Sequence, residues 1–136
     1  MYPESIVKPM KDELTTVGFE DCNTPEAVDN AIKTEGTVLM VVNSVCGCAA
    51  GAARPGVKMS LSGDKKPSKL TTVFAGFDID SVAQARKHFA PYPPSSPAIA
   101  LFKNGELVHF VERHNIEGRN AQMIAEHLKM VYEEFC

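Results

Sequence analysis

Residues 37–55 read TVLMVVNSVCGCAAGAARP. The run begins with β-branched and other apolar residues, which favour a buried strand, and ends in an alanine-rich segment with high helix propensity. Two thiols, Cys46 and Cys48, separated only by Gly47, lie at the expected change from strand to helix. Helix-terminal amides and the positive end of the helix dipole favour a negative charge there. The stretch therefore predicts a redox-active pair, because a thiolate is the nucleophile of thiol chemistry and a neighbouring thiol is its natural partner.

Length and composition predict a single domain over residues 1–136. The chain is 44% hydrophobic and 23% charged, which suits one sizeable core. A formal net charge of -3 argues against a nucleic-acid partner. The N-terminus lacks the pattern of a signal peptide, and the longest apolar run, residues 38–42, is far shorter than a membrane span. We therefore expect a cytoplasmic protein without a membrane partner, whose four cysteines are catalytic or metal-binding thiols rather than permanent disulfides.

Two helices are expected before the central strand. The first has apolar residues at helical spacing and ends before Gly18, which suits a left-handed helix terminus. The second begins at Thr24, a good capping residue, has Pro25 in its first turn and ends at Gly36. The expected inner faces carry Ile6, Val7, Met10, Leu14 and Val17 in the first helix, and Val28, Ala31 and Ile32 in the second.

A helix, a strand and a further helix are expected after the thiols. The first of these helices should extend to about Ser62 with a kink at Pro55, and the strand should span residues 70–75. Asp78 or Asp80 can cap the next helix, which carries Val82, Ala85 and Phe89. Because a strand, a helix and a second strand follow one another, the two strands should be parallel and joined by a right-handed crossover.

The last third of the chain predicts a shaped loop, a hairpin and a terminal helix. Residues 91–97 read PYPPSSP, which is too rich in proline for regular structure and contains several bonds that can be cis. Asn104-Gly105 separates strands expected over residues 98–103 and 106–113, a strong signal for an antiparallel hairpin. A helix should follow from about Gly118 to Phe135, and its expected inner face carries Met123, Ile124, Leu128, Val131 and Phe135.

This order of elements resembles the thioredoxin fold, an α/β fold of three layers in which helices flank a mixed central β-sheet. The resemblance rests on the dithiol between strand and helix, the proline within that helix, and the Ser96-Pro97 loop before the hairpin. Thioredoxin has two residues between its cysteines, whereas this chain has one. Along essentially the whole chain the sequence looks more like the bacilliredoxin family, on VVNSVCGCAAG at 41–51, ARP at 53–55, TVFAG at 72–76, PSSP at 94–97, VHF at 108–110, RH at 113–114, IEG at 116–118 and the terminal Cys136.

The resemblance implies a cytoplasmic enzyme that removes bacillithiol from mixed disulfides on client proteins, with bacillithiol as thiol co-substrate and no bound cofactor. Disulfide isomerase activity is also attributed to relatives. The family's CGC motif falls on Cys46, Gly47 and Cys48, which makes Cys46 the attacking thiol and Cys48 the resolving one. Pro97 takes the position of a cis-proline beside the site, and Cys136 matches the family's terminal cysteine and is a candidate accessory thiol.

The spacing of the cysteines and the proline loop each predict a property of the site. Residues two apart on a helix point to nearly opposite sides, so a Cys46–Cys48 disulfide requires local distortion that Gly47 can absorb. Such strain makes the bridge easy to reduce, which suits isomerisation or mixed-disulfide exchange better than strong reduction. A cis bond before Pro97 would turn the backbone of Ser96 toward an extended client peptide, which could pair with it as a strand. We therefore expect Gly47, Ser96 and Pro97 to bind substrate.

For the polar residues around the thiol stretch we favour a structural role over a catalytic one. Arg54 could support a thiolate or bind an acidic part of bacillithiol, but an exposed helix arginine is the commoner case. Asn43 and Ser44 lead into the turn and are expected to satisfy backbone groups there.

The histidines near the end of the last strand and the two cysteines outside the motif are weaker candidates for the site. His109 and His114 are expected to have sheet or turn roles rather than acid–base roles. Cys136 can contribute only if the last helix ends beside the thiol pair, and a frayed, oxidisable terminus is an equal alternative. Cys22 is most simply a free thiol.

Two other classes of protein remain open. A metal or iron–sulfur protein could use Cys46, Cys48 and Cys136 as ligands, although a tetrahedral zinc site wants four ligands and no second closely spaced Cys or His pair accompanies the motif. A thioredoxin-like interaction module could use the pair as a redox switch without turnover. Exchange with bacillithiolated or disulfide-bonded client proteins is favoured over both.

Overall fold

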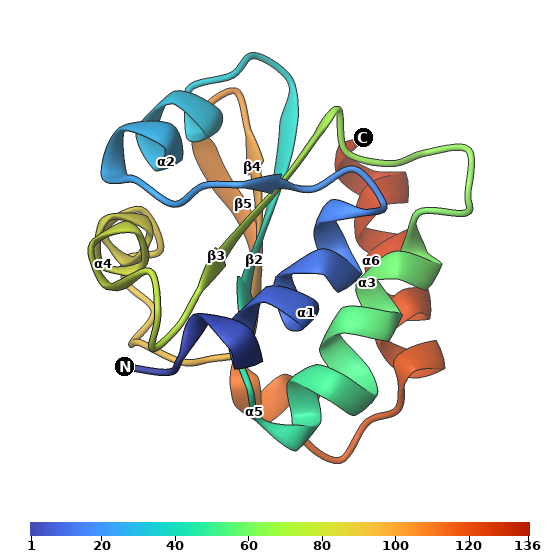
Figure 1. Ribbon diagram of the computed structural model, residues 1–136. Helices are drawn as coiled ribbons and strands as arrows, with labels where there is room; N and C mark the ends of the chain where they lie inside the picture. The colour runs from blue at the N-terminus through green and yellow to red at the C-terminus, as the bar shows by residue number, and fades with distance from the viewer.

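The computed structural model describes residues 1–136 and contains a five-stranded mixed sheet in the order β1-β3-β2-β4-β5. The strands are β1 Glu20–Asp21, β2 Thr37–Asn43, β3 Lys69–Phe74, β4 Ala98–Lys103 and β5 Glu106–Val111. The helices are α1 Glu4–Thr15, α2 Pro25–Ile32, the π-helical turn η1 Ala49–Ala53, α3 Arg54–Ser60, α4 Ile79–Lys87, α5 Arg113–Ile116 and α6 Ala121–Phe135. Figure 1 shows α2 and α4 on one face of the sheet and α1, α3 and α6 on the other, which are the expected three layers.

The central strand is β2, which is buried along its whole length. It pairs in parallel with β3, where Val41 lies opposite Thr72, and in antiparallel with β4, where Val41 lies opposite Ile99. The parallel pair follows from the crossover through η1 and α3, and the hairpin turns at Asn104 and Gly105, whose φ angles are 51° and 85°. The expected pairing is therefore confirmed.

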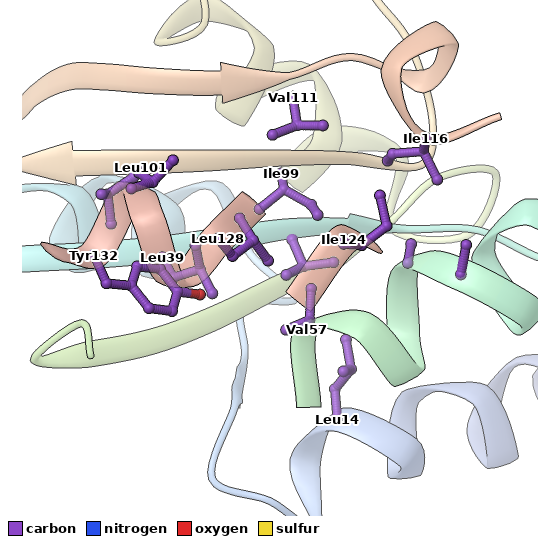
Figure 2. Close-up of a cluster of buried hydrophobic side chains, with 14 of the residues drawn as sticks. Leu14, Leu39, Val57, Ile99, Leu101, Val111, Ile116, Ile124, Leu128 and Tyr132 are labelled. Atoms are coloured by element: carbon purple, nitrogen blue, oxygen red, sulfur yellow. The ribbon is translucent and has the colours of Figure 1, made fainter. Parts of the chain in front are cut away.

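Alternate side chains of β2 enter two hydrophobic cores, one on each face of the sheet. Leu39 and Val41 join residues of α1, α3 and α6 in one core, part of which is shown in Figure 2. Val38, Met40 and Val42 join residues of α2 and α4 in the other. A strand buried on both faces needs apolar residues at every position, which explains the continuous apolar run in the sequence.

The packing of α3 against α6 sets the position of the helix that follows the thiols. Gly56 lies so close to α6 that a Cβ atom there would come within 2.7 Å of the Ile124 Cβ. At the far end of α3 the Ser60 hydroxyl lies 3.0 Å from the Tyr132 hydroxyl. The two helices are thus held together along the length of α3.

Some expected inner-face residues face solvent. Ile6, Val17 and Met123 have exposed fractions of 48%, 41% and 49%. The buried stripe of α1 is narrow and contains Val7 and Leu14, and α1 ends at Thr15, before Val17. The stripe of α6 is centred on Ile124, Leu128 and Tyr132, so Met123 is rotated off it by one residue. These three assignments are wrong, because periodicity alone does not give the width of a buried face.

The single helix expected up to Ser62 is divided. The backbone forms the π turn η1 immediately before Arg54 and Pro55, and α3 then continues to Ser60. Proline has no N–H to donate within a helix, and a π turn is one way in which a helix accommodates such a break. A kink was expected at Pro55, and the feature that the structure has there is a change of helix type on its N-terminal side.

Two short elements were not expected from the sequence. Strand β1 pairs in parallel with β3, and α5 directly follows β5. Both are too short to produce a periodic pattern.

None of the helices has the length and apolarity needed to cross a bilayer.

Candidate active site

Cys46 and Cys48 lie where β2 has ended and helical backbone begins. The Cys46 carbonyl accepts hydrogen bonds from the amides of Ala49 at 3.1 Å and Ala50 at 3.2 Å, which closes the first turn. The two sulfur atoms are 3.3 Å apart as free thiols, and both residues are half-buried. A shared hydrogen bond between the sulfurs is possible at this distance, so one thiol can stabilise the thiolate of the other.

The surroundings of the two thiols shift their pKa values in opposite directions. Burial raises the pKa of Cys46, but hydrogen bonds from the Ser44 side chain, the Ala49 amide and Cys48 outweigh it and leave that pKa below its ordinary value. Burial, followed by the hydrogen bond to Cys46 and the negative charge of Cys46, raises the pKa of Cys48. The pair therefore favours a thiolate on Cys46 and a protonated thiol on Cys48.

Arg54 is buried and braces the turn that leads to Cys46, so the expectation of an exposed helix arginine is wrong. Only 2% of the residue is exposed. Its Nη1 donates to Asn43 Oδ1 at 3.0 Å and to the Ser44 carbonyl at 2.7 Å. Its Nε lies 3.2 Å from Glu13 Oε2 as an ion pair without hydrogen-bond geometry. The packing of α3 back along β2 places the guanidinium under the turn, which sequence spacing alone did not indicate.

Asn43 and Ser44 satisfy backbone groups, as expected, and they connect Arg54 to the nucleophile. Asn43 Oδ1 accepts from the Ser44 amide at 2.8 Å, and Asn43 Nδ2 donates to the Met10 carbonyl at 3.1 Å. Ser44 Oγ accepts from the Cys46 amide at 3.2 Å. The backbone before Cys46 is thus fixed by three buried or half-buried hydrogen bonds, at the Ser44 amide, the Ser44 carbonyl and the Cys46 amide.

Ser96 and Pro97 lie at the same end of the sheet as the thiols. Ala98, the next residue, pairs with Val42 at the end of β2, and the Ser96–Pro97 bond is cis. The Ser96 carbonyl accepts from Arg113 Nη1 at 3.1 Å, whereas its amide makes no hydrogen bond within the chain. An extended peptide could therefore pair with the Ser96 amide, while the carbonyl is already occupied.

Arg113 is a site residue that the sequence reasoning missed. The charges of Cys46 and Cys48, in that order, raise its pKa, so the guanidinium lies within electrostatic reach of both sulfurs. The side chain is 43% exposed. The signal available in the sequence was a cation at the end of the last expected strand, in a sheet where the thiols follow one strand and the proline loop precedes another.

The structure places Cys136 and Cys22 away from the thiol pair, and no histidine makes a hydrogen bond to either thiol. Cys136 ends α6 at the far end of the molecule from α5 in Figure 1. Cys22 is buried in the core between the sheet and helices α2 and α4, and burial together with Glu20 raises its pKa to about 12. His109 Nε2 lies 2.9 Å from Nε2 of His127, and His114 is exposed. No group of three or more His, Cys, Asp or Glu side chains is placed to hold a metal ion.

A mixed sheet that presents two free thiols at the start of a helix, beside a cis-proline, defines a thiol–disulfide oxidoreductase of the thioredoxin class. The fold is similar to oxidised thioredoxin from Plasmodium falciparum, with a TM-score of 0.58 and 18% identity over 87% of this chain and 98% of that one. It is also similar to mitochondrial thioredoxin 3 from Saccharomyces cerevisiae, with a TM-score of 0.60 and 14% identity over 90% of this chain and 98% of that one.

Sequence comparison identifies the family within that class. The family described as "Disulphide isomerase" matches residues 2–136. A bacilliredoxin from Cytophaga hutchinsonii is 63% identical over 98% of this chain and 99% of its own length. A second, from Halalkalibacterium halodurans, is 50% identical over 99% of this chain and 94% of its own. The chain belongs to the bacilliredoxin family of thiol–disulfide oxidoreductases.

Proposed function

We propose that this protein removes bacillithiol from mixed disulfides on client proteins, with Cys46 as the attacking thiol and Cys48 as the resolving thiol. The observation that carries the proposal is the pair of sulfurs 3.3 Å apart whose pKa values are shifted in opposite directions. A thiolate at neutral pH attacks, and a neighbouring thiol that is protonated until needed resolves. Family membership supports the choice of bacillithiol as the small thiol.

In the first step the Cys46 thiolate attacks the bacillithiol sulfur of the mixed disulfide. The bond between bacillithiol and the client sulfur breaks, and its electron pair leaves with the client cysteine as a thiolate, which takes up a proton. A new disulfide joins bacillithiol to Cys46. The step exchanges one disulfide for another without net oxidation.

Two routes can clear the adduct on Cys46. In one, Cys48 loses its proton and attacks the Cys46 sulfur, which forms a Cys46–Cys48 disulfide and releases bacillithiol as a thiolate. The protein has then given two electrons to the mixed disulfide, and a low-molecular-weight thiol must reduce it afterwards. In the other, a second bacillithiol attacks the bacillithiol sulfur of the adduct, which forms bacillithiol disulfide and releases Cys46 as a thiolate, while Cys48 stays a thiol throughout.

The proposed roles of Gly47, Ser96 and Pro97 concern access to the sulfurs. Gly47 has no atom within 4 Å of the position where a Cβ would lie, so the side of the motif between the thiols is open. The unpartnered Ser96 amide can donate to the backbone of a client segment next to the mixed disulfide. The protein needs no bound cofactor in this scheme, and we propose that it acts in the cytoplasm, where free thiols persist.

Intact-protein mass spectrometry of Cys48→Ser mixed with a bacillithiolated client tests the mechanism. We expect one bacillithiol per protein, mapped to Cys46, together with release of the reduced client. Cys46→Ser should accept no bacillithiol, and Cys136→Ser is the matched control that should keep full turnover. Turnover in Cys46→Ser, or an adduct that maps to Cys48, would contradict the assigned order of attack.

Disulfide isomerisation is a second candidate function, favoured by the description of the matching family. The same Cys46 thiolate would attack a client disulfide, and a client thiol would later displace it. The experiment above distinguishes the two activities, because an isomerase gives a disulfide-linked client on Cys48→Ser without the small-thiol adduct.

A further inference from the structure

We propose that Arg113 forms a carboxylate-binding subsite beside the thiol pair, which selects mixed disulfides whose small thiol is anionic. The proposal deepens the proposed function and rests on it, because bacillithiol carries carboxylates. It concerns a residue outside the CGC motif, on an element that the sequence did not reveal. Three features of the structure support it.

The first feature is the position of Arg113 relative to the reacting sulfurs. It begins α5, which only Glu112 separates from β5, and Val111 at the end of β5 lies opposite Ile99 of β4. Arg113 is therefore at the end of the sheet where the Ser96-Pro97 loop and the thiols lie. The influence of both thiolate charges on the pKa of Arg113 agrees with this placement.

The second feature is that the guanidinium is held in place. Glu112 and Asn115 form a reciprocal capping box that fixes the start of α5. The Arg113 amide donates to Ser95 Oγ at 3.3 Å, and Nη1 donates to the Ser96 carbonyl at 3.1 Å. A cation fixed in this way loses less rotational freedom when it binds an anion than a free surface arginine does.

The third feature is unused hydrogen-bonding capacity. Nε pairs with Glu117 Oε1 at 3.3 Å and Nη1 binds the Ser96 carbonyl, but Nη2 makes no hydrogen bond within the chain. The side chain is 43% exposed, which leaves the Nη2 donors accessible to a ligand. A guanidinium with free donors recognises a carboxylate through short, charge-assisted hydrogen bonds.

The subsite acts on the first exchange step. A carboxylate on the small thiol would bind Arg113 while the thiol's sulfur faces the Cys46 thiolate, so that this sulfur is attacked rather than the client's. Attack then forms the Cys46–small-thiol disulfide and expels the client thiolate, as in the scheme above. The carboxylate contact thus selects which sulfur of the mixed disulfide is attacked as well as which small thiol is accepted.

A series of mixed disulfides on one client peptide tests the subsite. The peptide carries bacillithiol or mercaptosuccinate as anionic thiols, 2-mercaptoethanol as a neutral thiol, and cysteamine as a cationic thiol. Single-turnover rate constants are measured for Cys48→Ser and for the same protein with Arg113→Gln. The ratio of anionic to neutral rate constants cancels any effect of Arg113 on Cys46 reactivity, because that effect is common to both substrates.

We expect Arg113→Gln to lower the anionic-to-neutral ratio about tenfold, the size of one charge-assisted hydrogen bond. Arg113→Lys, which keeps the charge, should lose less, and Glu117→Gln, which removes the competing carboxylate, should raise the ratio. In the parent protein, which is Cys48→Ser with Arg113 intact, the anionic-to-neutral ratio should fall as salt is added. An unchanged ratio in Arg113→Gln, or no preference for anionic over cationic adducts in the parent protein, would overturn the proposal.

The parent protein's own charge preference keeps the test valid if Arg113→Gln does not fold. It also separates this inference from the proposed function. If mercaptosuccinate is removed faster than 2-mercaptoethanol but bacillithiol is not removed at all, the carboxylate subsite stands and the assignment of bacillithiol fails. If bacillithiol is removed no faster than cysteamine, the assignment stands and the subsite fails.

Discussion

At the scale of single residues, the reactivity of the site depends on hydrogen bonds around Cys46. The charge of a thiolate is stabilised where the Ser44 side chain, the Ala49 amide and Cys48 converge. Ser44 is in turn fixed through Asn43 and Arg54. Replacement of Ser44, Asn43 or Arg54 should therefore change the reactivity of Cys46, even where the replaced residue does not touch the sulfur.

Ser44→Ala should raise the pKa of Cys46, because it removes a hydrogen bond that favours the thiolate. With a higher pKa, less thiolate is present at pH 7 and alkylation is slower. The measurement is the pH dependence of iodoacetamide labelling at Cys46, mapped by mass spectrometry in a Cys136→Ser background. Ser62→Ala, just beyond the far end of α3, is the control and should leave the labelling profile unchanged. A profile in Ser44→Ala that coincides with that control would refute the role of Ser44.

Arg54→Met should both destabilise the protein and slow the reaction of Cys46. Methionine fills much of the space, but the Ser44 carbonyl and Asn43 Oδ1 lose their buried donor, which should cost about 2 kcal/mol. Urea unfolding measures the stability, and iodoacetamide labelling of the folded protein at pH 7 measures the reactivity. Arg119→Met, at an exposed position, is the control and should change neither. Loss of stability with unchanged labelling would show that the brace supports the fold and does not act on Cys46.

At the scale of elements, the helix that starts with the thiols is positioned by close contact between α3 and α6. Gly56 allows this approach, because a Cβ atom there would lie 2.7 Å from Ile124 Cβ and 3.0 Å from the Ala121 carbonyl. The apolar stripe of α6 then fills the space between α3 and the sheet (Figure 2). The position of Arg54 under the thiol turn depends on this packing.

Gly56→Ala should destabilise the protein by about 2 kcal/mol, since the clash with α6 exceeds the advantage of alanine in a helix. Gly51→Ala is a matched control in the preceding turn, where no atom lies within 4 Å of the added Cβ. That variant should be neutral or up to about 1 kcal/mol more stable. Urea midpoints compare the two, and equal stabilities would mean that α6 can shift to accommodate the methyl group.

At the scale of the whole molecule, stability should fall at alkaline pH through Cys22, far from the active site. Its pKa is raised to about 12, mainly by burial. A group with a raised pKa stabilises the folded state fully below its unfolded pKa and loses that contribution as pH rises toward the folded value. The raised pKa of Cys22 should therefore lower the free energy of unfolding by about 1 kcal/mol between pH 8 and pH 10. Tyr132, whose pKa burial also raises to about 12, adds a smaller loss.

Urea unfolding at both pH values in parent protein and Cys22→Val measures the contribution of Cys22. The lowered pKa of Cys46 acts with the opposite sign, and both proteins share it, so the difference between them isolates Cys22. We expect Cys22→Val to lose less stability than the parent from pH 8 to pH 10. Equal losses would show that the pKa of Cys22 is the same in the folded and unfolded states.

Much of the fold and the centre of the site follow from local sequence. The apolar run before the thiols, the Asn104-Gly105 turn and the proline-rich loop each carry a local conformational preference, and the corresponding strand, hairpin and cis bond are present. The thiol pair is also local, because two residues separated by a single residue remain neighbours in any fold. These features need no knowledge of distant contacts.

The surroundings of the thiols were decided only when the chain packed. Arg54 reaches the end of β2 because α3 lies back along the sheet, and Arg113 lies within electrostatic reach of the thiols because β2 and β5 end at the edge where β4 begins. Cys136, a candidate by its position in the sequence, is carried to the other end of the molecule by α6. Periodicity and propensity describe neighbours along the chain, whereas the charge around a sulfur depends on residues brought together across the sheet. The sequence thus specified the nucleophile, and tertiary structure specified what tunes it.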